Sequence, residues 1–268
     1  MECITSVTPT ICEVVEVPRP AISTDRTLTG VVRAVRENIG TGHVERCLVF
    51  APDAIGRSLF RERIDRFSPV LERAPHMAEL RSVVPPKTPV CFASMFTGAM
   101  PEGHGIRKYE RPVLTCDTLF DALARAGKRV AIVAVKGSSI DTIFRQRKVD
   151  YFSEDYDKEV RSRAIGLIEA DRHEFILAYN QEYDDEMHRN GPRSPEALRA
   201  MDNHIRTFQE LTDAVDRHWG GHDRLIAFTP DHGAHDEKDG PRKGDHGQDI
   251  PEDMEVVHLF GVGKGGHR

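Results

Sequence analysis

Short apolar runs alternate along the chain with longer segments in which apolar residues recur at helical spacing. Runs rich in aliphatic and β-branched residues predict buried strands at residues 47–50, 130–135, 175–179 and 225–228. The longest amphipathic segment between them begins with an N-cap residue, Ser194, followed by Pro195. A further short strand is expected in "LRSVVPPKTP", where prolines stop it, and a short helix follows in "CFASMFTGAM". Histidines on or beside the helices, such as His204, are expected to face solvent or cap helix ends.

Strands that alternate with helices predict an α/β fold with a mostly parallel central sheet and helices on both faces. In such sheets, ligands bind beyond the carboxyl ends of the strands. Polar residues follow four of the predicted strands, namely Asp53, Thr88, Asp184 and Asp231 with His232. Because these strand ends share one edge of the sheet, we expect the five side chains to form a functional site.

Composition and charge are those of a soluble globular protein. The chain has 268 residues, of which 39% are hydrophobic and 30% charged, and we expect residues 1–268 to form one domain. A formal net charge of −6 offers no basic surface for nucleic acid, and no apolar run is long enough to span a membrane. Residues 1–45 form an extension whose helical stretch "TLTGVVRAVREN" could pack on the sheet edge or form the subunit interface of a homodimer.

The cysteines give information about the compartment. Cys3, Cys12, Cys47, Cys91 and Cys116 are scattered without a C-x-x-C pair, which argues against a disulfide framework and against a thiolate zinc site. The first twenty residues contain neither the basic cluster nor the apolar stretch of a secretory signal. We therefore expect a cytoplasmic protein.

Histidine and aspartate recur in "TPDHGAHDEKDGPRKGDHG", residues 229–247, immediately after a predicted strand. An acidic surface loop does not require repeated histidine, whereas imidazole and carboxylate groups are ligands of zinc and manganese. Asp184 and His188 lie four residues apart, so a helix places both on one side, although Asp185 fits the composition equally well. Asp231 and His232 are adjacent, so in an extended segment their side chains diverge toward two neighbouring positions.

Residues 87–106, "KTPVCFASMFTGAMPEGHGI", resemble the nucleophile segment of the alkaline phosphatase superfamily and are most similar to its nucleotide pyrophosphatase/phosphodiesterase branch. Four further segments resemble the metal-binding motifs of that branch and occur in the same order, "APDAIG", "DDEMHRNGP", "TPDHG" and "GDHGQDIPEDMEVVHLFGVG". The resemblance extends from residue 47 to the C-terminus. The combined match is far more specific than any single motif.

This resemblance implies an alkaline-phosphatase-like hydrolase with two divalent metal ions, zinc or manganese. One metal would be held by Asp184, His188 and His246, and the other by Asp53, Asp231, His232 and the oxygen of Thr88. Thr88 would attack phosphorus and form a phosphothreonine that water then hydrolyses. For the last ligand, His235 and Asp245 lie near enough in sequence to replace His246.

The chain departs from this branch at Cys91, where an asparagine usually supplies an amide donor to the phosphoryl oxygens. Loss of such a donor can cost ~3 kcal/mol of transition-state stabilisation, so another group must replace it or the substrate must differ. Lys87 and the backbone near Cys91 lie beside the expected oxyanion position in the motif. Lys136 and Asn180, near the ends of predicted strands, are further substrate-binding candidates.

The resemblance implies cleavage of phosphate esters, with phosphodiesters or nucleotide pyrophosphates favoured as small-molecule substrates. A phosphomonoesterase or a phosphonate hydrolase with the same site is the enzymatic alternative. A metal-binding member of the fold without turnover is the alternative from a different class, because one fold hosts several functions.

Overall fold

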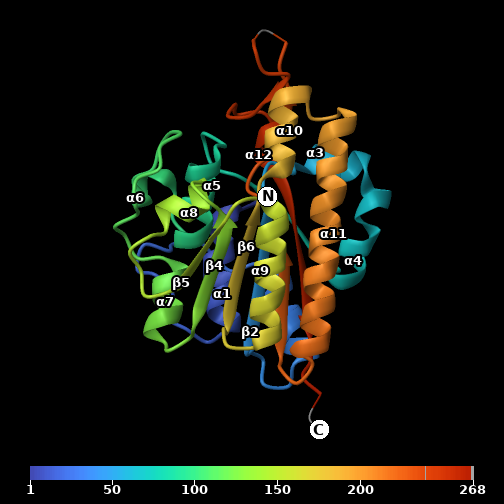
Figure 1. Cartoon of the computed structure of the whole chain (residues 1–268). Helices are drawn as coiled ribbons and strands as arrows, with labels where there is room; N and C mark the ends of the chain where they lie inside the picture. Colours follow the sequence, from blue (N-terminus) through green and yellow to red (C-terminus); the bar gives the residue numbers. More distant parts are fainter. Residues whose placement is uncertain (239, 267–268) are drawn as a thin grey trace.

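An eight-stranded sheet forms the centre of the protein (Figure 1). The computed structural model describes residues 1–238 and 240–266. From one edge to the other, the strands are β1 (Glu2–Cys3), β3 (His76–Arg81), β10 (Glu255–Gly263), β7 (Arg224–Phe228), β2 (Arg46–Pro52), β6 (Phe175–Asn180), β4 (Val130–Val135) and β5 (Asp150–Glu154). Strand β10 runs antiparallel to both neighbours, and the other pairs are parallel. The predicted mostly parallel sheet is confirmed.

Helices cover both faces of this sheet, as predicted (Figure 1). One face packs against α1 (Val7–Val14), α2 (Thr29–Asn38), α5 (Thr88–Thr97), α7 (Leu119–Arg125) and α8 (Ser139–Ile143). The other face packs against α3 (Arg57–Glu62), α4 (Ser68–Arg73), α9 (Asp157–Ala170), α10 (Glu182–Asn190) and α11 (Pro195–His218). Successive residues of β2 alternate between the two cores, since Val49 lies in the first and Leu48 and Phe50 lie in the second.

The remaining elements are short. They are η1 (Ile4–Ser6), η2 (Ile64–Phe67), α6 (Pro101–His104), α12 (Pro251–Met254) and the paired strands β8 (His235–Asp236) and β9 (Gly244–Asp245). Within residues 1–238 and 240–266, no helix combines the length and the apolar character needed to cross a membrane.

The N-terminal residues complete the core on the face that carries α5. Strand β1 pairs with β3 at the sheet edge, and α2 packs against β3 and β10, as the sheet-edge alternative requires. Helix α1 packs against α5, where the Thr8 hydroxyl donates to the Met95 carbonyl at 2.7 Å. The N-terminal extension therefore supports the helix that begins at Thr88.

Two local expectations differ in part from the structure. The strand expected in "LRSVVPPKTP" begins earlier, at His76, and ends at Arg81, so the residues from Ser82 to Val84 lie between its end and the first proline. His204 does not face solvent but is completely buried, and it fits the helix-capping alternative, because its Nε2 accepts a hydrogen bond at 3.1 Å from the Tyr183 amide in the first turn of α10. Burial lowers the pKa of His204 to about 3, so the ring is neutral and free to accept this bond.

Two glycines bring the loops after β2 and β7 into backbone contact. A Cβ atom on Gly56 would lie 2.7 Å from the Gly233 Cα and 2.9 Å from the Glu252 carbonyl oxygen. Both distances are below those that a real side chain tolerates, so only glycine fits. These loops carry Asp53 and Asp231, and the glycines thus set how closely the two aspartates approach.

We expect Gly56→Ala to lower the stability of the protein by ~1–3 kcal/mol, because the added methyl group meets backbone atoms that cannot move aside. At ~2–4 °C per kcal/mol, thermal unfolding should show a fall of several degrees in Tm. Gly30→Ala in α2 is the matched control, since no atom lies within 4 Å of its added Cβ. The control should leave Tm unchanged or raise it slightly, and equal Tm values for the two variants would contradict the prediction.

Candidate metal centre

The site lies at the carboxyl ends of three neighbouring parallel strands, β7, β2 and β6. Asp53 follows β2, and Asp231 with His232 follows β7. Strand β6 leads directly into α10, whose first turns carry Asp184 and His188 on one side of the helix. The predicted convergence of these strand ends is therefore present.

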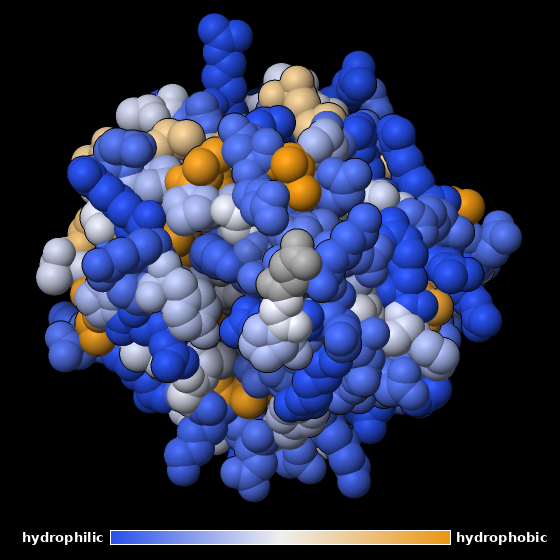
Figure 2. Space-filling model, turned by 90° about the horizontal axis from the view of Figure 1, so that it is seen from above, coloured by the Kyte–Doolittle hydropathy of each residue, from blue (hydrophilic) through white to orange (hydrophobic). Residues whose placement is uncertain are grey.

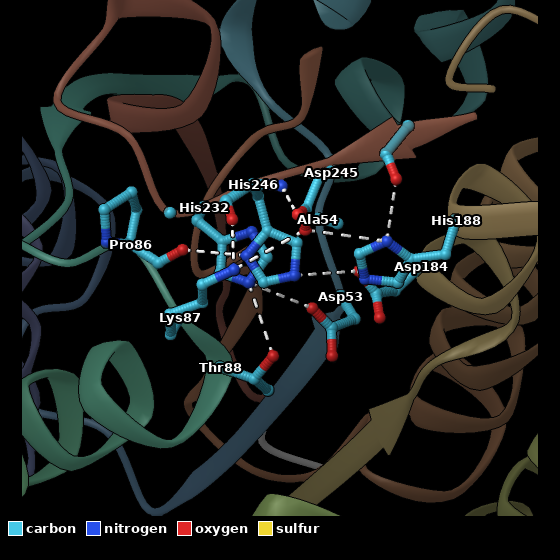
Figure 3. Close-up of polar contacts among 12 residues, drawn as sticks. Asp53, Ala54, Pro86, Lys87, Thr88, Asp184, His188, His232, Asp245 and His246 are labelled. Carbon is cyan, nitrogen blue, oxygen red and sulfur yellow. Dashed lines mark hydrogen bonds and ion pairs between the residues drawn. The ribbon is translucent and has the colours of Figure 1, made fainter. Parts of the chain in front are cut away.

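The first group of side chains is formed by Asp53, Asp231 and His232. Figure 3 labels Asp53 and His232 of this group. The His232 Nε2 lies 3.5 Å from the Asp53 Oδ1 and 3.3 Å from the Asp231 Oδ2. It also lies 3.3 Å from the Oγ1 of Thr88, the first residue of α5. The opposite ring nitrogen, Nδ1, contacts the Gly233 carbonyl at 3.0 Å, so it carries the proton and leaves the Nε2 lone pair facing the carboxylates.

The second group is formed by Asp184, His188 and His246 and has the same plan (Figure 3). The Asp184 Oδ1 lies 3.4 Å from the Nε2 atoms of both histidines. His188 Nδ1 lies 2.9 Å from the Gly244 carbonyl, and His246 Nδ1 lies 2.8 Å from the Pro86 carbonyl. Each of the three imidazoles is therefore oriented by a backbone carbonyl, with Nε2 turned toward an acid.

Both groups fit a divalent cation. Within each group, the three candidate ligand atoms lie within 4.8 Å of one another. The Asp53 Oδ1, Asp184 Oδ1 and Asp231 Oδ2 atoms are buried without a hydrogen-bond partner in residues 1–238 and 240–266. Burying unpaired carboxylate oxygens is costly, and a cation bound between them and the imidazoles removes this cost.

The alternative ligands left open by the sequence have other partners. Asp185 accepts a hydrogen bond from the Tyr156 hydroxyl at 2.7 Å. His235 contacts Asp253 through Nδ1 at 2.7 Å and Gln248 through Nε2 at 2.9 Å. Asp245 lies at the edge of the second group, where its Oδ1 is 3.2 Å from Arg242 and 3.5 Å from Lys87. The geometry thus favours Asp184 over Asp185, and His246 over His235 and Asp245, as candidate metal ligands.

Three buried carboxyl groups raise the cost of charge in this site. Burial raises the pKa of Asp53 well above its ordinary value, and the charges of Asp231 and Asp184 raise it further. Burial also raises the pKa of Asp231, to about 7. Burial also acts to raise the pKa of Asp184. The hydrogen-bond contact with His246 and the charges of the nearby imidazoles outweigh burial, and the pKa of Asp184 falls to about 2. A bound cation would favour the ionised form of all three.

A cavity of about 480 Å³ opens beside the two groups. Thr88, Lys87 and Lys136 line it together with ligand residues of both groups. The Lys87 ammonium is held by Asp245 and by the His246 carbonyl. The amides of Val90 and Cys91 both donate to the carbonyl of Lys87, the N-cap residue of α5, at 2.9 Å. These two amides therefore already have a hydrogen-bond acceptor.

Two of the predicted substrate-binding residues are not among the described residues that line this cavity. Cys91 is completely buried, and its Sγ lies 3.1 Å from the Ser82 hydroxyl. Asn180 is also buried, and its carbonyl accepts a hydrogen bond from the Asp53 amide at 2.9 Å. The observed contacts of both residues are therefore with the loops that carry ligands, and a substrate contact for either stays a prediction.

Two residues that the sequence interpretation missed fix the ligands in place. The buried Tyr179 hydroxyl donates to the Asp53 Oδ2. The completely buried Asp253 accepts hydrogen bonds through Oδ2 from the amides of Gly247 and Gln248, at 2.8 and 2.9 Å, beside His246. Tyr179 lies at the end of a predicted strand, and this position could have identified it as a residue near the site. Nothing in the sequence distinguishes Asp253 from the neighbouring acids.

Comparison with known structures shows the fold. The chain matches phosphonoacetate hydrolase from Sinorhizobium meliloti 1021, solved with phosphonoacetate, at 18% identity and a TM-score of 0.55, covering 73% of this chain and 58% of that one. The chain thus spans little more than half the length of that enzyme. It also matches murine ectonucleotide pyrophosphatase/phosphodiesterase 5, solved as an inactive threonine-to-alanine variant with AMP, at 13% identity and a TM-score of 0.62, covering 81% and 88%. The human counterpart matches at 13% identity and a TM-score of 0.61, covering 82% of this chain and 88% of that one.

Comparison of the sequence identifies the family. No individual curated protein matches the chain significantly by sequence. The family model for type I phosphodiesterase/nucleotide pyrophosphatase matches residues 47–262, which include every candidate ligand. The predicted resemblance is thereby confirmed, and the solved structures share the alkaline-phosphatase-like fold. The chain belongs to the type I phosphodiesterase/nucleotide pyrophosphatase family, a family of phosphoester hydrolases in the alkaline phosphatase superfamily.

Proposed function

We propose that this chain is a two-metal hydrolase that cleaves phosphodiesters or nucleotide pyrophosphates through Thr88. The observation that carries the proposal is the position of the Thr88 Oγ1, which lines the cavity and lies 3.3 Å from the Nε2 of a candidate ligand, His232. We also propose that residues 1–268 act as one hydrolase domain, because the N-terminal helices pack against α5.

The metal ions, zinc or manganese, would be held by the two groups described above and would supply the positive charge that lowers the pKa of a hydroxyl and neutralises phosphoryl oxygens. Thr88 lies at the N-terminus of the ten-residue helix α5, where the helix dipole favours negative charge on its oxygen. The Thr88 hydroxyl loses its proton to solvent, and its Oγ1 forms a bond to phosphorus as the bond from phosphorus to the leaving oxygen breaks. Water then attacks the phosphothreonine, the phosphoryl product leaves with the water oxygen, and the Thr88 hydroxyl regains a proton.

The similar proteins support this reaction without identifying the substrate. A threonine-to-alanine change is present in the inactive murine relative that binds AMP, in agreement with a threonine nucleophile here. The bacterial relative binds phosphonoacetate, which favours a phosphonate hydrolase as the second candidate. Cys91, in place of the amide expected in the diesterase branch, favours instead the alternative of a metal-binding member of the fold without turnover.

We expect Asp184→Asn to weaken metal binding far more than Asp185→Asn, although the two carboxylates are adjacent in sequence. Asp184 faces two histidines, whereas Asp185 accepts from Tyr156. Loss of one charged ligand should reduce affinity by more than the ~10–100-fold typical of an outer contact. Metal content after dialysis against zinc buffers measures the difference. Equal metal content in both variants would show that the second group is not a metal site.

We expect Thr88→Ala to abolish turnover, by ~10³-fold or more, while leaving metal content unchanged. Thr88→Ser is the matched control, because it keeps a hydroxyl and should retain measurable activity. The assay compares a chromogenic phosphodiester with its monoester, using protein loaded in turn with zinc and manganese. Preference for the diester supports the proposed substrate class, and preference for the monoester would replace it.

Two other outcomes would overturn the proposal itself. Unchanged turnover in Thr88→Ala would exclude Thr88 as the nucleophile. Metal binding by the wild-type protein without turnover of any phosphoester or phosphonate would identify a metal-binding protein that keeps the fold but lacks the reaction.

A further inference from the structure

Helix α10 carries two of the three candidate ligands of the second group, Asp184 and His188, and none of the first group. The position of this helix therefore affects the geometry of one metal group alone. In Figure 1, α10 lies above α9 and beside α11. The side chain of its N-cap residue, Gln181, makes no capping hydrogen bond to the helix. Contacts from other elements hold the beginning of α10 instead.

Two buried side chains from neighbouring helices accept hydrogen bonds from three consecutive amides at the start of α10. Asp157, the first residue of α9, accepts the amides of residues 181 and 182 through Oδ1 and Oδ2, both at 2.9 Å. His204, within α11, accepts the Tyr183 amide through Nε2 at 3.1 Å. Amides at the beginning of a helix have no acceptor inside it. These three, which directly precede Asp184 in sequence, are therefore held by side chains from two other helices.

Both acceptors lie inside the protein, although water could serve this purpose at an end of the molecule whose surface is mainly hydrophilic (Figure 2). Asp157 is 5% exposed, and His204 is completely buried. The two side chains also face each other, since the His204 Nδ1 lies 3.7 Å from the Asp157 Oδ2 and has no hydrogen-bond partner within the described residues. A packed side chain has far fewer positions than a water molecule, so the beginning of α10 is fixed in place and direction.

The start of α9 also determines how α10 is rotated about its axis. The hydroxyl of Tyr156, the N-cap residue of α9, donates to the Asp185 Oδ2 at 2.7 Å. Successive residues of a helix point about 100° apart, so Asp184 faces elsewhere while α9 holds Asp185. The Asp184 Oδ1 lies 3.4 Å from the Nε2 atoms of both histidines of the second group. Rotation of α10 by one residue would exchange the two acids.

We propose that Asp157 and His204 are positioning residues of the second metal group, which accept the first amides of α10 so that Asp184 faces the two histidines. This inference rests on the proposed two-metal function and extends it to side chains that are not among the described residues lining the cavity. Both act through the backbone of α10. Their loss should therefore weaken one metal site and spare the other, whose ligands lie on the loops after β2 and β7.

Calorimetric titration of the metal-free, whole chain with zinc tests this proposal. Asp157→Asn removes one of two acceptor oxygens, and His204→Leu removes the acceptor nitrogen. We expect the wild type to bind two zinc ions, and each variant to lower the affinity of one site about tenfold while changing the other less than about twofold. His204→Gln should restore an affinity close to that of the wild type, because its Oε1 can replace Nε2 as the acceptor.

Variants of the ligands identify which site is affected. In a chain that already carries Asp184→Asn, addition of Asp157→Asn should leave the affinity for the remaining zinc ion unchanged, because the first group does not depend on α10. In a chain that carries Asp231→Asn, the same addition should still weaken the remaining site about tenfold. The reverse pattern would show that Asp157 acts on the first group and would overturn the inference.

Thr118→Ala is the matched control, because the Thr118 side chain caps α7, a helix without candidate ligands, by accepting the Asp121 amide. It should lower the thermal stability and leave both zinc affinities unchanged. Circular dichroism shows whether each variant is folded. Unchanged affinities in both Asp157→Asn and His204→Leu would overturn the inference. An equal loss at both sites, or the same selective loss in Thr118→Ala, would also overturn it.

The wild-type protein separates this inference from the proposed function. Two zinc sites whose affinities the variants leave unchanged would overturn the positioning role alone. Selective weakening of one site in a protein that turns over no ester would support the positioning role and overturn the hydrolase proposal. A wild-type chain that binds no zinc would overturn the two-metal proposal together with this inference.

Discussion

Carboxyl oxygens without hydrogen-bond partners, buried at the carboxyl ends of three parallel strands, are the constraint on which the rest of the structure depends. Asp53, Asp184 and Asp231 each bury a carboxylate oxygen that accepts no hydrogen bond within the described residues. An apolar interior does not hold such atoms without a counter-charge. The three imidazoles are turned toward them by backbone carbonyls, so their free nitrogens and the free oxygens enclose the same two spaces. The fold therefore holds two groups of candidate ligands in place.

The same constraint explains why residues remote from the chemistry are held so tightly. Gly56 and Gly233 allow the loop after β2 and the loop after β7 to touch through their backbones. Asp253 accepts hydrogen bonds through Oδ2 from two amides next to His246, and its own carbonyl accepts one from the Gly233 amide at 2.8 Å. One buried residue thus ties the loop of the first group to the loop of the second. Displacement of either loop would be transmitted to both groups.

The sequence predicted the sheet and the helices on both faces, because these depend on local periodicity. It also named the residues that the structure brings together in two groups, because they belong to motifs with fixed spacing. It did not predict contacts that depend on tertiary packing. His204 belongs to an amphipathic helix, but only the packing of α11 beneath α10 shows that it is buried and accepts the Tyr183 amide. The choice between Asp184 and Asp185 likewise depends on how α10 is rotated about its axis, which neighbouring partners determine and composition does not.

Cys91, which stands where the related branch usually has an asparagine, has a structural contact in this protein. Its side chain lies against Ser82, whose hydroxyl donates to the Asp231 carbonyl at 2.7 Å, so this position supports the backbone of a ligand. The amides at the start of α5 are engaged with the Lys87 carbonyl. Cationic side chains that line the cavity are Lys87, Arg111, Lys136 and Arg242. Arg111 and Lys136 are the pair without a carboxylate partner in the described chain, and they lie on elements that hold no candidate ligand.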